Sequence, residues 1–304
     1  MAANSYEQLL VDLGSAFRPQ REWVDRRGVL LISGHFLTGV GSGTWLFSLL
    51  FHYRLGLFLS FLAVALGGVA HFLFLGHPER FWRMVKVRHS WIGRGFMGMS
   101  LFIPFSFLYL LPSYVPGLPW DESGVLGRIF LVLSLLGMAI LFAYKGNVYA
   151  ASKGIPFWNS PLLPVLYIAY ALRGGVALIL LSLPFTGSTV RPEQAAVIEL
   201  WIAVSAGVFI LFYLGVMANS NVATRQSVRD LTRGRVSGSF YLGTVLIGLV
   251  IPILLGGLGY LSPLSQEILA AVGLFSLVGD FFAKYTIAKA GVYMPLVPVA
   301  EVNK

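Results

Sequence analysis

Apolar segments of membrane-spanning length recur along the whole chain of 304 residues. A transmembrane α-helix needs about 20 mostly apolar residues, because the bilayer offers no water to satisfy backbone groups outside a helix. Turn-forming residues separate eight such segments. We therefore predict an all-α integral membrane protein with eight transmembrane helices, at residues 29–51, 55–75, 95–114, 125–147, 161–183, 195–218, 239–261 and 266–288.

Composition supports lipid as the main solvent of this protein. Hydrophobic residues make up 57% of the sequence and charged residues only 12%, whereas a soluble domain carries roughly 25% charged residues. The sequence contains no cysteine, which excludes disulfides, cysteine-ligated iron–sulfur clusters and c-type haem attachment within it. The first apolar run is long enough to stay in the membrane, so we do not interpret the N-terminus as a signal peptide.

The basic residues are distributed unevenly between the two sides of the predicted bundle. With eight helices both termini lie on one side, and that side holds eighteen of the 22 lysines and arginines. The opposite side holds Arg54, Arg128 and Arg191. Because basic loops remain in the cytoplasm, we predict that both termini are cytoplasmic. We interpret the net charge of +9 as this topology signal, and not as a sign of nucleic-acid binding.

Three regions follow from these predictions. Residues 1–28 form a cytoplasmic N-terminal segment, residues 29–290 the membrane domain, and residues 291–304 a cytoplasmic tail. Within the first region, residues 5–17 have the apolar spacing of a short amphipathic helix. Such a helix serves either as an interfacial anchor or as a docking site for a partner subunit, and the sequence leaves both open.

Several polar side chains lie at one depth, near the predicted cytoplasmic face. His35 is about two turns into the first span, His71 is near the end of the second, and Tyr144 is near the end of the fourth. Arg80 lies in the basic loop after the second span. A quinone needs hydrogen bonds to its two oxygens, a proton source and an apolar slot for its tail. Helix packing explains any one of these residues alone, but their common depth favours a quinone site, with Phe36, Trp82, Trp91 and Trp158 as candidates for the slot.

A second polar set lies deeper in the predicted membrane domain. Arg173 is in the fifth span, Glu199 is near the outer end of the sixth, and Asp280 and Lys284 share one face of the eighth. Charged groups in a bilayer are costly and therefore suggest function. These four are candidates for proton transfer, and the alternative is a structural ion pair that holds helices together.

Other chemistries fit the sequence less well. His35 and His71 are a candidate pair of haem b ligands, but the spans offer no second buried pair. An ion or proton transporter is a further alternative, although no pair of broken half-helices is evident. No cluster has the spacing of a zinc site, and no Ser/His/Asp arrangement converges. We therefore assign no metal site and no catalytic residue, and expect the protein not to be an enzyme by itself.

Two segments resemble a known family. One is Phe74-Leu-Gly-His-Pro-Glu-Arg-Phe-Trp82 with the following Ser90-Trp-Ile-Gly-Arg94. The other is Gly154-Ile-Pro-Phe-Trp-Asn-Ser-Pro-Leu-Leu-Pro-Val-Leu166, which leads into the fifth span. Both are similar to segments of the polysulfide reductase membrane subunits, the NrfD/PsrC family, which is distantly related to the DMSO reductase anchor. The number of spans and the placement of loops agree over nearly the whole sequence.

The resemblance implies two four-helix bundles without haem or iron–sulfur clusters, in a prokaryotic cytoplasmic (inner) membrane. It implies a quinone-binding anchor subunit of a respiratory oxidoreductase that holds menaquinone or ubiquinone. The implied partners are a ferredoxin-like iron–sulfur subunit and a molybdopterin or other catalytic subunit. His35 and Tyr144 match the family's quinone-binding histidine and tyrosine, Arg80 matches an arginine of the second-loop signature, and Trp158 and Asn159 belong to the second segment.

The sequence also departs from the family pattern at two positions. Phe74 stands where the family often has a histidine, and His71, one turn earlier, is a candidate substitute. Gly95 stands where the DMSO reductase anchor has a glutamate. The route of protons to the quinone is therefore open.

Overall fold

The computed structural model describes residues 17–86, 90–185 and 190–294. Within these ranges the protein is helical, apart from turns, loops and one isolated bridge between Pro19 and Val292. Eight helices are long and apolar enough to cross a membrane, which confirms the predicted number of spans. Six are the single helices α2 (Gly28–Leu50), α3 (Arg54–Phe74), α5 (Val125–Ala150), α6 (Leu162–Ser182), α7 (Pro192–Ala218) and α11 (Gln266–Ala290).

The other two spans combine shorter pieces. The third consists of α4 (Trp91–Leu110) and the short 3-10 turn η2 (Leu111–Ser113). The seventh runs from α9 (Ser237–Ser239) through a wide π-helical segment, η4 (Phe240–Val250), into α10 (Ile251–Leu258). Pro252 lies just after η4 and has no amide hydrogen, so a regular hydrogen-bond ladder cannot run through this point.

Local residue chemistry sets several helix ends. The Ser90 hydroxyl accepts a hydrogen bond from the Ile92 amide, and α4 therefore begins before the predicted residue 95. Ser265 caps α11 in the same way through the Ile268 amide. Pro192 occupies the first turn of α7, where the missing amide hydrogen costs nothing.

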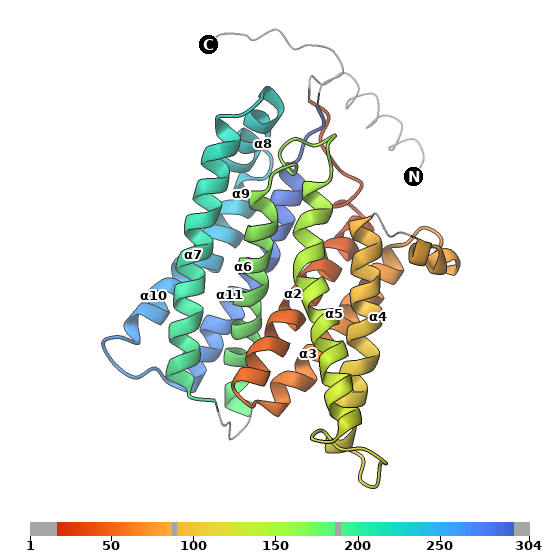
Figure 1. The fold of residues 1–304 in the computed structure, drawn as a ribbon. Coiled ribbons are helices and arrows are strands. Elements are labelled where there is room, and N and C mark those ends of the chain that lie inside the picture. The colour runs from red at the N-terminus through yellow and green to blue at the C-terminus, as the bar shows by residue number, and fades with distance from the viewer. Residues whose placement is uncertain (1–16, 87–89, 186–189, 295–304) are drawn as a thin grey trace.

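Helices α2 and α6 form the interior of the bundle. In each of their apolar windows 67% of the residues are buried, compared with 28% for the spans of α4 and α5. Figure 1 shows the helices side by side, with α4 and α5 at one edge and α7 and α10 at the other. Helix α2 packs mainly on α3 and α6, and α6 also packs on α11, α7 and α5. The division into two four-helix bundles stays a prediction.

Glycines allow α2 and α6 to approach each other closely. A Cβ atom on Gly43 would lie 2.0 Å from the carbonyl oxygen of Ala171, and one on Gly175 would lie 2.2 Å from the carbonyl carbon of Gly43. No side chain fits between backbones at this distance. The small residues that the sequence shows in the first span therefore serve helix contact.

The two described ends of the chain meet at one end of the bundle. The Gln20 amide donates to the Gly291 carbonyl at 2.9 Å, and the Tyr293 amide donates to the Arg18 carbonyl at 2.9 Å. Two loop helices lie outside the spans, the 3-10 helix η1 (Pro78–Lys86) and α8 (Val222–Thr232). The amphipathic helix predicted for residues 5–17 lies, except for Phe17, outside the described residues, as does most of the C-terminal tail.

The structure corrects the assignment of two basic residues to the cytoplasmic surface. Lys145 is 0% exposed within α5, and Lys284 is 1% exposed within α11. Packing of neighbouring helices buries both, which hydropathy alone does not reveal. Without them the charge difference between the two sides remains large.

The close contact of α2 and α6 gives the first prediction. Gly175→Val places a branched side chain against the Gly43 backbone, and overpacking of this kind costs about 1–3 kcal/mol. We expect a lower thermal unfolding temperature of the purified protein in detergent. Gly215→Val is the matched control, since nothing lies within 4 Å of a Cβ there. Equal unfolding temperatures of the two variants would contradict the proposed contact.

Candidate functional site

A cavity of about 860 Å³ lies among α2, α3, α4 and α5. Most of its lining is apolar, and three polar side chains, His35, His71 and Tyr144, reach it from three helices. Val69 and Phe72 of α3 also line it and are 54% and 46% exposed, so the cavity opens onto the lipid-facing surface of the bundle. The structure thus brings together three of the residues selected from the sequence.

His71 and Tyr144 form a hydrogen-bonded pair in this cavity. The Nδ1 atom of His71 is 2.7 Å from the Gly67 carbonyl oxygen and must donate to it, because a carbonyl only accepts. In the neutral ring Nε2 is then the acceptor, and the Tyr144 hydroxyl lies 3.2 Å from it and donates. This arrangement fixes both the tautomer of His71 and the direction of the tyrosine hydroxyl.

His35 lies next to this pair and is itself buried. Its ring centroid is 5.2 Å from that of His71 and 5.8 Å from that of Tyr144. Its Nδ1 atom lies 3.3 Å from the hydroxyl of Tyr149, which the sequence analysis did not select. Tyr149 thus orients the ring, and Nε2 is the nitrogen that remains to hydrogen-bond a ligand.

Two glycines make room for these side chains. A Cβ on Gly34 would lie 2.4 Å from Nδ1 of His71, and a Cβ on Gly95 would lie 2.4 Å from Cδ2 of Tyr144. Any larger residue would displace the histidine or the tyrosine. The close approach of α2 to α3 and of α4 to α5 at this depth therefore depends on glycine.

Arg80 is not among the residues that line the cavity. Its side chain is 53% exposed, and its Nε atom lies 3.7 Å from a carboxylate oxygen of Glu79. Its neighbour Phe81 does line the cavity, so η1 covers part of it with apolar side chains. The exposed side chain of Trp82 and the ring of Trp91, stacked under Arg94, are also absent from the lining.

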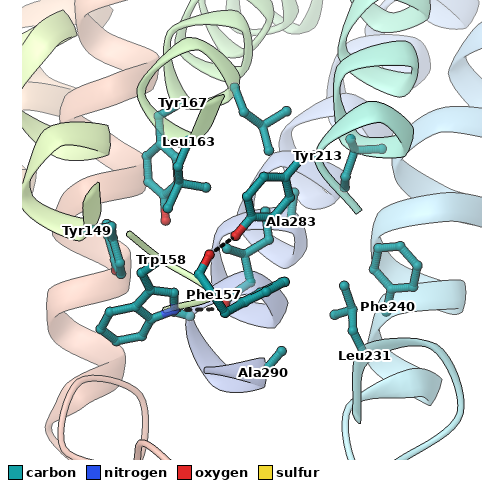
Figure 2. Close-up of a cluster of buried hydrophobic side chains, with 14 of the residues drawn as sticks. Tyr149, Phe157, Trp158, Leu163, Tyr167, Tyr213, Leu231, Phe240, Ala283 and Ala290 are labelled. Atoms are coloured by element: carbon teal, nitrogen blue, oxygen red, sulfur yellow. Dashed lines mark hydrogen bonds between the residues drawn. The ribbon is translucent and has the colours of Figure 1, made fainter. Parts of the chain in front are cut away.

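Trp158 and Asn159 have structural contacts away from the cavity. Figure 2 shows Trp158 in a cluster of buried side chains that also contains Tyr149 and Phe157. Its Nε1 donates to the Ile287 carbonyl at 3.1 Å. The Asn159 amide donates to the Ala150 carbonyl at the end of α5. Trp158 packs edge-on against Tyr149, with ring centroids 4.9 Å apart. It therefore supports the tyrosine that orients His35.

The two cavity histidines do not fit haem ligation in this arrangement. Axial ligands stand on opposite faces of the macrocycle. His35 and His71 instead contact each other edge-on, and Nε2 of His71 accepts from Tyr144. Among the described residues, no three His, Cys, Asp or Glu side chains lie together as a metal site. Phe36, another slot candidate, packs edge-on against Phe281 of α11.

The second predicted set forms a fully buried ion-pair cluster. The guanidinium of Arg173 donates to Glu199 at 3.1 Å, to Asp280 at 3.3 Å and to the Ser276 hydroxyl at 2.9 Å. Ser276 in turn donates to the same oxygen of Glu199 at 2.6 Å. Helices α6, α7 and α11 each contribute. A Cβ on Gly174 would lie 2.9 Å from Oδ2 of Asp280, so this glycine also makes room.

Several buried polar atoms beside this cluster have no hydrogen-bond partner among the described residues. They are Oε2 of Glu199, Oδ2 of Asp280, Nζ of Lys284 and the hydroxyls of Tyr167 and Tyr170. The Lys284 nitrogen lies 5.2 Å from the ring centroid of Tyr170 and 5.8 Å from that of Phe36. Lys284 therefore links the cluster to the helix that carries His35.

A family profile described as "Polysulphide reductase, NrfD" matches residues 28–295, which is most of the protein. The chain belongs to the NrfD family. It is thus a multi-pass membrane protein of a family of reductase subunits, as the two sequence segments indicated.

Relatives of this NrfD-family protein have names that agree with the assignment. It is 28% identical over 253 residues to Protein NrfD of Escherichia coli, and the match covers 75% of this sequence and 79% of that protein. It is 22% identical over 199 residues to a polysulfide reductase polypeptide of Wolinella succinogenes, covering 60% and 63%. It is 20% identical over 279 residues to a selenate reductase subunit of Mesobacillus selenatarsenatis, covering 75% and 66%.

The structure shows the surroundings of Phe74 and Gly95, the two positions at which we expected this NrfD-family protein to depart from the family pattern. Phe74 and His71 both line the cavity, so the histidine that reaches the cavity from α3 comes from one turn earlier. At Gly95, a side chain would collide with the Tyr144 ring. A glutamate at this position and the observed place of Tyr144 exclude each other.

Replacement of Arg173 gives the second prediction. Arg173→Met leaves two buried carboxylates without their cation, and breaking such a buried pair costs about 3–5 kcal/mol. We expect a large fall in thermal stability in detergent. In the exposed Arg54–Glu122 pair, Arg54→Met should cost less than about 1 kcal/mol. If the two variants unfold at the same temperature, the cluster contributes nothing to stability.

Proposed function

We propose that the cavity binds a quinone and that the protein is the quinone-binding membrane anchor subunit of a respiratory oxidoreductase complex. The single observation that carries this proposal is the convergence of His35, His71 and Tyr144 on one apolar cavity. Its volume of about 860 Å³ lies within the usual range of ligand pockets, roughly 300–1,000 Å³. Its opening toward lipid suits a ligand with an apolar tail.

A bound menaquinone or ubiquinone supplies two-electron, two-proton redox chemistry. His35 is suited to hydrogen-bond one quinone oxygen through Nε2, since Tyr149 engages Nδ1. Tyr144 is suited to donate its hydroxyl hydrogen to the other oxygen once the hydroxyl turns away from His71. His71 is suited to return a proton to the tyrosine after its Nε2 has taken one up from the aqueous side. Phe81 and Met84 of η1 shield the cavity from water. Arg80 has no role in this version, because its guanidinium is exposed and paired with Glu79.

The partner in this proposal is an iron–sulfur subunit that docks on the basic side of the bundle, with a molybdopterin or other catalytic subunit beyond it. The relatives named after polysulfide reductase and selenate reductase support a place in a multi-subunit reductase. The uneven distribution of lysine and arginine supports a cytoplasmic location of that side in a prokaryotic inner membrane. Basic loops also attract an acidic partner.

A second candidate function is proton movement through the core, coupled to the quinone or independent of it. The observation that favours it is the group of unpartnered buried atoms around Arg173, Asp280 and Lys284. Polar atoms without partners in a membrane interior are expected to take part in relays or to bind water. An independent transporter would move ions across proteoliposomes without any redox partner, whereas the coupled version requires quinone turnover.

Removal of the His35 ring tests the quinone site. His35→Ala deletes the group assigned to one quinone oxygen, and we expect quinone-linked electron transfer by the complex to fall on the order of a hundredfold. Activity of the complex with a soluble dye should stay unchanged. His77→Ala, at an exposed histidine of the adjacent loop, is the control. Normal quinone turnover in the His35 variant would overturn the assignment.

The orientation is open to direct labelling, because the protein has no cysteine. Single cysteines at the exposed positions Lys153 and Ser262 lie in loops on opposite sides of the bundle. We expect a membrane-impermeant thiol reagent added to intact cells to modify Ser262→Cys and to spare Lys153→Cys. Cell lysis should make both reactive, which controls for accessibility. Labelling of Lys153→Cys in intact cells would place the basic side outside the cytoplasm.

A further inference from the structure

Lys145 is a buried basic residue that the proposed quinone chemistry does not yet use. It follows Tyr144 in α5 and is 0% exposed. Its side-chain nitrogen donates to the Leu141 carbonyl of its own helix and lies 5.2 Å from the centroid of the Tyr144 ring. Tyr144 lines the cavity, so this nitrogen lies directly behind one wall of the candidate site.

A glycine on α2 faces this lysine at ordinary contact distance. A Cβ on Gly39 would lie 3.5 Å from Cε of Lys145 and 3.9 Å from its Nζ. Gly39 is one helical turn after His35 and on the same face of α2. The same Cβ would lie 3.7 Å from Ala171 of α6. Lys145 thus reaches the junction of α2, α5 and α6, one turn deeper than His35.

The surroundings of Lys145 provide no counterion. The titratable groups that act on it or respond to its charge are His35 on α2, His71 on α3 and Lys284 on α11, and Tyr144 lies beside it on its own helix. Ala171 of α6 lies near the same point, 3.7 Å from the Cβ position on Gly39. Among the described residues, no carboxylate oxygen lies within 4.0 Å of its nitrogen, in contrast to Arg173.

The charges buried in the described spans are unequal in number. The carboxylates are Glu199 and Asp280, and the cations are Arg173, Lys284 and Lys145. The Arg173 guanidinium pairs with both carboxylates. Among the described residues, neither Lys284 nor Lys145 has a carboxylate oxygen within 4.0 Å, and Lys145 is the one of the two that lies behind the cavity wall, beside Tyr144. An unpaired ammonium in an apolar interior is strongly unfavourable, so a lysine there stays neutral until an anion comes near.

We propose that Lys145 balances negative charge on the ligand of the cavity by taking up a proton as that charge appears. The neutral amine accepts one proton from the aqueous side, and the ammonium and the anionic ligand then compensate each other across the Tyr144 ring. In turnover, the first electron delivered by the iron–sulfur cluster of the partner subunit is matched by the one proton that Nζ takes up, so the net charge of the interior does not change at that step. The inference rests on the proposed quinone site and adds that the site favours an anionic ligand over a neutral one.

Two ring ligands of nearly equal size test the inference on the purified full-length protein in detergent. Methylnaphthoquinone is neutral, and hydroxynaphthoquinone is an anion at neutral pH. Calorimetry in two buffers of different ionisation enthalpy measures both the affinity and the protons taken up with each ligand. For the unmodified protein we expect uptake of about one proton with the anion and none with the neutral quinone. Binding of the anion without proton uptake would overturn the inference, and this result needs no variant.

Two variants assign the proton to Lys145. Lys145→Met should lower the affinity for the anion by about tenfold or more and abolish the proton uptake. The affinity for the neutral quinone should change less than about twofold. Lys145→Arg keeps a permanent charge, so the anion should bind without uptake. Lys153→Met, at an exposed lysine just beyond α5, is the control and should behave like the unmodified protein.

The outcomes separate this inference from the proposed function. If neither ligand binds the unmodified protein, or if His35→Ala leaves both affinities unchanged, the quinone site itself is wrong. If both ligands bind and proton uptake persists in Lys145→Met, another group takes the proton and only the inference fails. If Lys145→Met binds neither ligand, the lysine shapes the cavity, and this result also overturns the inference.

Discussion

Arg173 is paired with two carboxylates from two other helices, and the second half of the bundle is organised around these contacts. In a bilayer there is no water to solvate a charge, so each buried ion must find its partner inside the protein. The guanidinium is suited to this task because its planar group of N–H donors can hydrogen-bond several acceptors at once. Helices α6, α7 and α11 are therefore held at one relative depth, and α6 positions α2 through the Gly43–Gly175 contact.

The cavity depends on this scaffold through α2. Once α6 fixes α2, the face of α2 that carries Gly34, His35 and Gly39 has a set position against α3 and α5. Gly34 admits the His71 ring, and Gly39 faces the Lys145 side chain. The polar groups of the site thus come from helices that pack closely, and the apolar space remains between α3 and α4, which touch each other less.

Sequence alone predicted the features that local chemistry determines. Hydropathy is a property of each segment, so the eight spans were correct without knowledge of their contacts. The depth of a residue in its span is equally local, and it brought His35, His71 and Tyr144 to one face. Arg80 and Trp158 were selected with them, but they lie between the spans, where depth in a span does not place a side chain. Arg80 is exposed on η1 beside its neighbour Glu79, and Trp158 is held by a tertiary contact with the Ile287 carbonyl.

Lys145 illustrates the opposite limit. Its charge near the end of a span predicted a place at the aqueous surface, and only the neighbouring helices reveal that it is buried. Gly39, which faces it, looked like an ordinary helix-contact residue, since the sequence does not show which side chain lies opposite a glycine. When three helices together bury a side chain, the sequence of no single helix shows that the side chain is buried.

The buried charges differ between the Arg173 cluster and the cavity. The cluster around Arg173 contains two carboxylates and can compensate its own cations. Lys145 lies on the cavity side, beside Tyr144, where the described residues provide no acid. Electrons that arrive on a ligand create negative charge, and a neutral amine beside the cavity that takes up a proton at that moment favours such a ligand over its neutral form. Because the same lysine becomes charged only together with the ligand, the resting cavity stays apolar and admits a neutral molecule from the lipid.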